Sequence, residues 1–320
     1  MSQKAKVIVI IAALAVVLGA LVALNYTVVD HDAIVAGFNA EFIERPDGYR
    51  GLVAAYDFDF ASPPRQMDTG LMYRACADGA VDVICGFATD GRIEAYDLQP
   101  LVDDRLFFPP YYAAPLVRSD TLEEHPELRD VLNSLSGRIS DETMGQMNLE
   151  VDRDIQPLTA SAVAHNFLVA EGLIDADQEP GSGSAGTITV GGKDFTEQDI
   201  LGEILAQIIE YNTDLQVRRR LYLGGTMICF QGIIAGDLDM YPEYTGTGLV
   251  NILDEEVISD PEEAYDFVKE AFAEVYDLEW LEPFGFNNTY TLTMRREHAE
   301  ELGIETISDL ADHIRGAGGR

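Results

Sequence analysis

The residues best suited to binding chemistry gather in segment 241–248, which reads Tyr-Pro-Glu-Tyr-Thr-Gly-Thr-Gly. Pro242 fixes one backbone dihedral angle, whereas Gly246 and Gly248 free others, so the pattern predicts an irregular loop that presents two tyrosines and two threonines. Tyrosine rings can stack on a ligand while their hydroxyls form hydrogen bonds. The segment therefore resembles a binding loop, and a surface turn whose tyrosines simply pack is the competing interpretation.

Lys193 is a second candidate, because it follows two glycines at the end of an alternating strand pattern, 187–190. Thr196 with Asp199 is typical of a capping box that opens an amphipathic helix reaching Tyr211. Such a junction holds Lys193 beside a helix amino terminus and favours an anionic group. The Gly-Lys-Ser/Thr spacing of a phosphate-binding loop is missing, and a solvated loop lysine is the alternative.

Histidines and cysteines form no catalytic or metal-binding pattern. No histidine pair has metal-ligand spacing, no nucleophile elbow is present, and an odd, scattered set of cysteines does not describe a disulfide framework. We therefore expect buried free thiols, no enzymatic activity, no metal site and no cofactor. The residues concerned are His31, His125, His165, His298, His313, Cys76, Cys85 and Cys229.

Composition narrows the class of protein further. A chain of 320 residues, 47% of them hydrophobic, can bury one large core or two medium ones. It carries 21 lysines and arginines against 56 aspartates and glutamates, a formal charge of −35. Because such a chain repels polyanions, we expect it not to bind nucleic acid or anionic lipid.

The first 29 residues have the pattern of a signal anchor. Lys4 and Lys6 precede an uncharged apolar run, 7–24, and no charge follows until Asp30. This run is long enough to span a bilayer once, and the positive-inside rule places the remaining chain outside the cytoplasm. A cleaved signal peptide is the alternative, although no small-x-small cleavage site precedes Tyr26.

The periodicity of the remaining chain predicts alternating strands and helices, hence an α/β fold. A polar loop, 88–91, follows a buried strand at its carboxyl end, where open α/β sheets bind ligands. Prolines extend segment 106–118, which is too apolar for a free linker and is predicted to cross between two lobes. Segment 175–186 has no apolar periodicity and is predicted to be a flexible linker.

We expect strands over 33–38, 81–87, 187–190 and 216–223, with a further strand after 283–292. Helices are predicted over 51–56, 68–78, 123–135, 140–148, 160–171, 226–235, 261–276 and 307–314. Ser140 and Ser259 are the expected caps of the helices that follow them. Arg45 is predicted to lie at a strand-to-loop edge, beside the Pro-Asp-Gly turn at 46–48.

With these pieces in hand, the chain resembles the substrate-binding proteins of glycine betaine, carnitine and choline uptake by ABC transporters. The matching stretches are 191–198, 241–247, 285–290, 45–48, 89–93 and 107–111, and together they span residues 33–320. This resemblance implies a two-lobed α/β fold of the periplasmic-binding-protein-like type II, with a two-strand hinge, that closes on its ligand.

The order of the stretches departs from the family pattern, in which the half like 187–320 precedes the half like 33–174. The chain is therefore expected to be circularly permuted, with 175–186 joining the two family termini. One lobe would combine 187–284 with 116–174, and the other 290–320 with 33–110. We expect a monomer, and a fragment of a longer tandem array is the alternative.

The resemblance also implies the site. A quaternary ammonium group would lie against Tyr244, Tyr290, Tyr111 and Phe87, the last of which is commonly tyrosine in the family. Lys193, Arg45 and Thr247 would contact a carboxylate, and Asn288 is a weaker candidate. By sequence alone Tyr112 is as good as Tyr111, and Arg45 could instead form an exposed ion pair with Glu44 or Asp47.

The implied function is the binding of such an osmolyte outside the cytoplasmic membrane and its delivery to the permease subunits of an ABC transporter. A membrane-tethered osmolyte sensor that uses the same fold is the alternative, because the single predicted anchor permits both.

Overall fold

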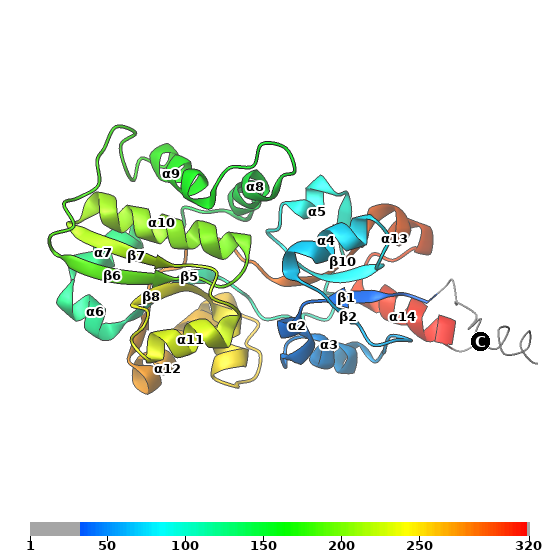
Figure 1. Ribbon diagram of the computed structural model, residues 1–320. Coiled ribbons are helices and arrows are strands. Elements are labelled where there is room, and N and C mark those ends of the chain that lie inside the picture. Colours follow the sequence, from blue (N-terminus) through cyan, green and yellow to red (C-terminus); the bar gives the residue numbers. More distant parts are fainter. Residues whose placement is uncertain (1–32, 319–320) are drawn as a thin grey trace, which may run out of the picture.

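Two five-stranded mixed sheets organise residues 33–318, the part of the chain that the computed structural model describes (Figure 1). Each sheet forms the centre of one lobe, which confirms the two-lobed α/β prediction. The predicted anchor, 1–29, lies outside the described residues. Within 33–318, no helix combines the length and the apolar character needed to cross a bilayer.

Lobe 2 is built on the sheet with strand order β2-β1-β3-β10-β4. β1 runs parallel to β2 and β3, whereas β10 is antiparallel to both β3 and β4. The strands are β1 (Ala36–Phe38), β2 (Arg65–Gln66), β3 (Val83–Phe87), β4 (Leu98–Pro100) and β10 (Tyr290–Arg295). Its helices are α2 (Ala40–Glu44), α3 (Tyr49–Tyr56), α4 (Thr69–Ala77), α5 (Arg92–Ala95), α13 (Arg296–Leu302) and α14 (Ile307–Gly318).

Lobe 1 is built on the sheet with strand order β7-β6-β8-β5-β9. Here β6 is parallel to β7 and β8, and β5 is antiparallel to β8 and β9. The strands are β5 (Ala113–Arg118), β6 (Gly186–Gly191), β7 (Leu215–Arg220), β8 (Met240–Tyr244) and β9 (Leu278–Trp280). The helices are α6 (Ser119–Glu124), α7 (Glu127–Asn133), α8 (Asp141–Asp152), α9 (Ala160–Ala170), α10 (Thr196–Asn212), α11 (Thr226–Ile234), the π-helix η1 (Thr247–Ile252) and α12 (Pro261–Tyr276).

Helix α10 occupies the centre of lobe 1. It packs against α7, α8, α9 and the strands β6, β7 and β8, so both its sides are covered. This explains why its sequence is apolar around most of its circumference, a pattern that a surface helix does not have. The three cysteines, Cys76, Cys85 and Cys229, are buried and free, as predicted, and burial raises the pKa of each thiol.

The chain passes between the lobes twice, once between β4 and β5 and once between β9 and β10 (Figure 1). These two segments pair through an antiparallel bridge between Tyr112 and Asn287. The Tyr111 backbone N–H donates to the Asn287 side chain at 2.7 Å, and the Asn288 N–H donates to the Tyr111 carbonyl at 3.1 Å. The connection between lobes is therefore a hydrogen-bonded pair of extended segments.

Segment 241–248 is not the irregular loop that its composition predicts. Its first part forms β8, and the remainder opens the π-helix η1. Pro242 is accommodated because it stands opposite Pro115 of β5, so both missing N–H donors fall at one position of the ladder. Tyr241 is fully buried, and Tyr244 reaches the end of the strand.

Four further local predictions are wrong. Arg45 does not lie at a strand-to-loop edge, because α2 forms between β1 and the turn, and Arg45 is the C-cap of that helix. The helix predicted over 123–135 is two helices, α6 and α7, because Pro126 cannot continue a helix and caps the second one. The capping box at α10 does not form, since Phe195 is its N-cap and the Thr196 hydroxyl donates instead to Asp152 at 2.7 Å. Asp260, rather than Ser259, caps α12 by accepting from two backbone N–H groups.

Segment 175–186 contains no helix and only the first residue of β6. It lies along the end of α10, where the Gly181 N–H donates to the Glu210 carbonyl at 2.7 Å. The Ala185 N–H donates to the Asp214 carbonyl at 2.9 Å. The second half of the segment is thus attached to lobe 1.

Gly48, in the turn after α2, provides a test of this local structure. A Cβ atom at this position would lie 2.0 Å from the Phe42 carbonyl oxygen, so Gly48→Ala should lower the free energy of unfolding by about 1–3 kcal/mol. Chemical denaturation measures the change. Gly316→Ala is the control, because no atom lies within 4 Å of its Cβ position and alanine favours helix α14. Equal stabilities of the two variants would contradict this account of the turn.

Candidate functional site

A cavity of about 500 Å³ lies between the lobes. All eight residues selected from the sequence line it, although they come from segments as far apart as α2 and β10. Tyr111 faces the cavity, whereas its neighbour Tyr112 lines a different hollow. The eight are Arg45, Phe87, Tyr111, Lys193, Tyr244, Thr247, Asn288 and Tyr290.

Strand direction explains why these side chains meet. β1, β3, β6 and β8 all end at the cavity, and the residues that follow each carboxyl end line its wall. Glu41 follows β1, Phe87 ends β3, Lys193 follows β6 and Thr247 follows β8. The carboxyl edge of an open α/β sheet is the usual position of a ligand site, and here two such edges face each other.

Five aromatic rings form a continuous row along the cavity. Tyr111 meets Tyr290 edge to face with centroids 5.6 Å apart, and Tyr290 contacts Phe87 at 5.1 Å. Phe87 stacks on Phe195 at 5.6 Å with an interplanar angle of 4°, and Phe195 faces Tyr244 at 6.3 Å. Since Phe87 belongs to lobe 2 and Phe195 to lobe 1, the stacked pair carries the row of rings from one lobe to the other.

The basic residues of the site lie beside these rings. The Lys193 ammonium is 5.2 Å from the centroid of Tyr244, and the Arg45 guanidinium is 5.4 Å from that of Tyr290. Both distances are typical of a cation–π contact. The aromatic wall therefore already interacts with positive charge supplied by the protein.

Both basic residues are also buried and paired. Lys193 donates to Glu243 at 2.6 Å and to the Thr226 hydroxyl at 2.9 Å, so it is not the solvated lysine of the alternative interpretation. Arg45 binds Asp47 through two hydrogen bonds of 2.7 and 2.6 Å, and this pair is buried rather than exposed. Burial of a charge requires such a partner.

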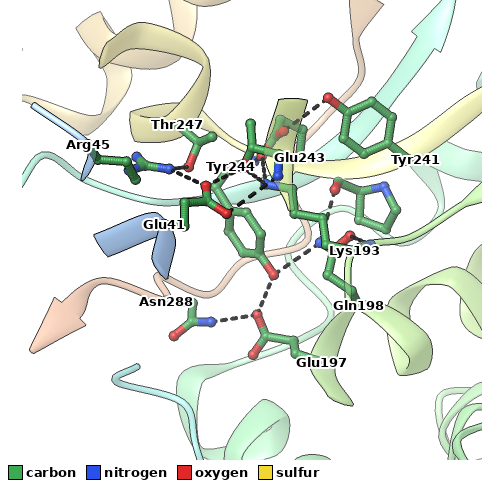
Figure 2. A network of polar contacts seen from close by, with 12 residues as sticks. Glu41, Arg45, Lys193, Glu197, Gln198, Tyr241, Glu243, Tyr244, Thr247 and Asn288 are labelled. Carbon is green, nitrogen blue, oxygen red and sulfur yellow. Dashed lines mark hydrogen bonds and ion pairs between the residues drawn. The ribbon is translucent and has the colours of Figure 1, made fainter. Parts of the chain in front are cut away.

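A row of alternating charges lies along the cavity, and Figure 2 shows its members Glu243, Lys193, Glu41 and Arg45. In sequence along the row, the groups are Glu243, Lys193, Thr226, Glu41, Arg45 and Asp47. Glu41 accepts from the Thr226 hydroxyl at 2.6 Å and from Arg45 at 3.0 Å. Three carboxylates thus alternate with two cations.

Burial acts to raise the pKa of Glu41. The charges of Lys193 and Arg45, with hydrogen bonds from Thr226 and Arg45, outweigh it and hold that pKa below its usual value. Glu41 is therefore a carboxylate at neutral pH, and the row carries one net negative charge.

Another buried carboxylate, Glu197, lies at the hydroxyl end of Tyr244 (Figure 2). One oxygen accepts from the Tyr244 hydroxyl at 2.7 Å and from Asn288 at 2.8 Å. The other accepts from Thr89 at 2.5 Å and from Asn148 at 3.1 Å. Burial raises the pKa of Glu197, and these four hydrogen bonds oppose that effect.

The lobes contact each other on both sides of the cavity. Arg45 and Glu41 of lobe 2 reach Thr247 and Thr226 of lobe 1. Beyond the aromatic row, Arg92 of lobe 2 pairs with Asp152 of lobe 1 at 3.3 Å. The two lobes are therefore in direct contact on both sides of the cavity that lies between them.

Sequence reasoning missed several residues that shape the site. Glu41 and Phe195 line the cavity, Thr226 lies between Lys193 and Glu41, and Glu197 holds the hydroxyl of Tyr244. Phe195 and Glu197 lie within the matching stretch 191–198, so an aromatic and an acidic residue at the start of α10 were available signals. Glu41 offered none, because its partner Thr226 is 185 residues away.

Two α/β lobes with a two-segment connection and a cavity between them define a bilobal binding protein. A sequence profile described as the substrate-binding domain of the ABC-type glycine betaine transport system matches residues 24–170 and 186–320. The chain belongs to this family. Its membership confirms the prediction of a binding domain rather than an enzyme.

Individual relatives match the chain over part of its length. It is 41% identical over 136 residues to the carnitine transport binding protein OpuCC of Listeria monocytogenes. The matched region covers 42% of this chain and 43% of that protein. It is 37% identical over 145 residues to the glycine-betaine-binding protein of Pseudomonas aeruginosa, covering 45% of this chain and 46% of that one. The chain thus spans about half the length of these relatives.

Among solved structures, a glycine betaine/carnitine/choline ABC transporter is 36% identical. That match has a TM-score of 0.35 and covers 44% of this chain and 51% of the other.

Removing the Glu197 carboxylate tests whether it holds the site together. Glu197→Ala leaves four donors without an acceptor and should lower the free energy of unfolding by about 1–3 kcal/mol, because each stranded buried group is costly. Glu197→Gln should cost less, since it keeps one acceptor oxygen. Thermal and denaturant unfolding measure both, with the exposed Glu270→Ala of α12 as the control. A Glu197→Ala variant as stable as this control would contradict the supporting role.

Proposed function

We propose that the chain binds a small quaternary-ammonium osmolyte of the glycine betaine, carnitine or choline type. The observation that carries this proposal is the aromatic row, which lines the cavity between the lobes with rings from both of them. A quaternary ammonium group cannot donate hydrogen bonds, so aromatic faces are its best partners, each contributing about 0.5–2 kcal/mol. The cavity volume is in the range usual for small-molecule sites.

The cation would lie against Tyr244, Tyr290, Tyr111 and Phe87. We add Phe195, because it continues the same row between Phe87 and Tyr244. Phe87 and Phe195 can supply faces but no hydroxyl groups, so this part of the wall stacks without hydrogen-bonding.

The other half of the ligand would face the polar wall. Lys193, Arg45, Thr247 and Asn288 are proposed to contact it. Lys193 uses two of its three N–H groups on Thr226 and Glu243, and Arg45 uses four of its five on Asp47, Glu41 and Thr247. Each cation therefore keeps one N–H group that can donate to a ligand oxygen. Because its charge is already paired with a carboxylate of the protein, we expect it to bind the ligand more weakly than an unpaired cation would.

We further propose that the domain works outside the cytoplasmic membrane, tethered by residues 1–29, and delivers its ligand to the permease of an ABC transporter. Family membership supports the transport role, and the lysines ahead of the apolar run support the orientation. Complementation of an osmolyte-uptake mutant separates transport from the sensor alternative, because a sensor would bind the ligand without restoring uptake.

One chain is proposed to form one binding unit, with its two halves in circularly permuted order. Each sheet combines strands from both sides of segment 175–186: β10 lies between β3 and β4, and β5 lies between β8 and β9. The profile matches two blocks, 24–170 and 186–320, on either side of the same segment. Helix α14 packs against α3, so the last described helix returns to the lobe that contains β1 (Figure 1).

Variants of the aromatic wall test the ligand class. Tyr290→Leu keeps apolar volume but removes a π face, so we expect affinity for glycine betaine and choline to fall by about 0.5–2 kcal/mol. Tyr290→Phe should bind like the unaltered protein, because the face remains. Isothermal titration measures both, and Tyr96→Ala, outside the cavity, is the control. The proposed ligand class is wrong if the unaltered protein shows no response to any betaine or choline compound at millimolar concentration.

A protein that begins at Asp30 tests the proposed unit. We expect it to be monomeric and to bind one ligand per chain, because both sheets and the whole cavity wall come from the residues it retains. Light scattering gives the mass, and titration gives the stoichiometry. A strictly dimeric protein that exchanges lobes, or binding only after a second chain is added, would favour the tandem-array alternative.

A further inference from the structure

Glu41 has a position that the proposed ligand contacts leave unexplained. It lines the cavity from α2 of lobe 2, and its side chain is 30% exposed, so the carboxylate is in contact with the cavity space. One oxygen accepts from the Thr226 hydroxyl at 2.6 Å and from Arg45 at 3.0 Å. The other lies 3.4 Å from the Thr226 backbone nitrogen, at the amino terminus of α11.

These contacts resemble those expected for a bound carboxylate. A ligand carboxylate would be drawn to the same combination of an Arg45 guanidinium, a Thr226 hydroxyl and a helix amino terminus. Lys193 adds to the attraction, since it shares the Thr226 hydroxyl with Glu41. The protein therefore supplies its own anion at the place where a zwitterionic ligand would put one.

The surrounding charges work in the same direction. The charged residues that line the cavity among residues 33–318 are Glu41, Asp68, Asp194, Arg45 and Lys193. Behind them, Asp47 and Glu243 already neutralise the two cations. A ligand with a net positive charge would balance this excess of carboxylates, whereas a net-neutral zwitterion would add a further negative group beside Glu41.

We propose that Glu41 is a specificity-determining residue that makes the cavity select cationic quaternary ammonium ligands, such as choline, over zwitterionic ones, such as glycine betaine. This inference rests on the proposed function, and it specifies which of the proposed ligands the cavity prefers.

A purely structural role for Glu41 makes a different prediction. Gly225, the N-cap of α11, has no side chain to cap the helix, so Glu41 could simply provide that cap from the opposite lobe. In that case Glu41→Gln, which keeps an acceptor oxygen for Thr226 and removes only the charge, would change the affinities for all ligands alike. Selection by charge instead requires Glu41→Gln to change the ratio of the affinities for choline and glycine betaine in favour of glycine betaine.

The experiment compares choline with glycine betaine by isothermal titration on the unaltered protein and on Glu41→Gln. We expect the unaltered protein to prefer choline. We expect Glu41→Gln to shift the ratio of the two dissociation constants toward glycine betaine by about tenfold or more, because a charge inside a protein site is only partly screened. Glu44→Gln is the matched control, since it removes the same charge from the same helix at an exposed position that does not line the cavity.

A second comparison needs no variant. Glycine betaine methyl ester differs from glycine betaine mainly in the loss of the carboxylate charge, so the unaltered protein should bind the ester about as well as choline. A ratio that Glu41→Gln leaves unchanged, or a preference of the unaltered protein for glycine betaine over its ester, would overturn the selectivity proposal and leave the proposed function standing. If the unaltered protein binds none of the three compounds, the proposed function fails and this inference fails with it.

Discussion

The carboxylate of Glu197 is the constraint on which the arrangement of the site depends. A buried carboxylate is costly unless donors surround it, and this one has donors in lobe 2, in α8, in β8 and in the second connecting segment. The four hydrogen bonds to this one carboxylate therefore fix the positions of Thr89, Asn148, Tyr244 and Asn288 relative to one another. The orientation of the Tyr244 ring, and with it one end of the aromatic row, follows from that requirement.

The charges of the polar wall follow the same rule. Lys193 and Arg45 can be buried beside aromatic rings because Glu243 and Asp47 neutralise them, and those carboxylates are themselves held by the hydroxyls of Tyr241 and Tyr111. Each ion pair is thus completed by a tyrosine hydroxyl, from the cavity residue Tyr111 in one pair and from the fully buried Tyr241 in the other. The aromatic and ionic parts of the cavity form one connected structure, so a change in either would alter the other.

Sequence reasoning predicted the two-lobed α/β fold, and the family resemblance selected eight residues that share one cavity. The motifs that carry the resemblance, such as Gly-Gly-Lys and Tyr-Pro-Glu-Tyr, lie at or just beyond strand ends that face the cavity. Sequence reasoning failed where the deciding contact is distant. The residues near Glu41 in the sequence give no sign that it will contact Thr226. Similarly, the Thr196 hydroxyl donates to Asp152 of another helix, so Thr196 does not form a capping box with Asp199. The break at Pro126 was a local signal that the apolar periodicity of 123–135 obscured.

Closure and selectivity share residues in this site. Glu41–Thr226 and Arg45–Thr247 join opposite lobes, so any opening of the lobes breaks these contacts. The measured affinity of a ligand that binds to the open form includes the free energy of re-forming them. A variant of Glu41 alters that contribution for every ligand. Because closure brings the same lobes together around choline or glycine betaine, its contribution largely cancels in the ratio of the two affinities. The ratio of the two affinities therefore measures the effect of the Glu41 charge on the ligand. Each affinity taken alone also contains the free energy of closing the lobes.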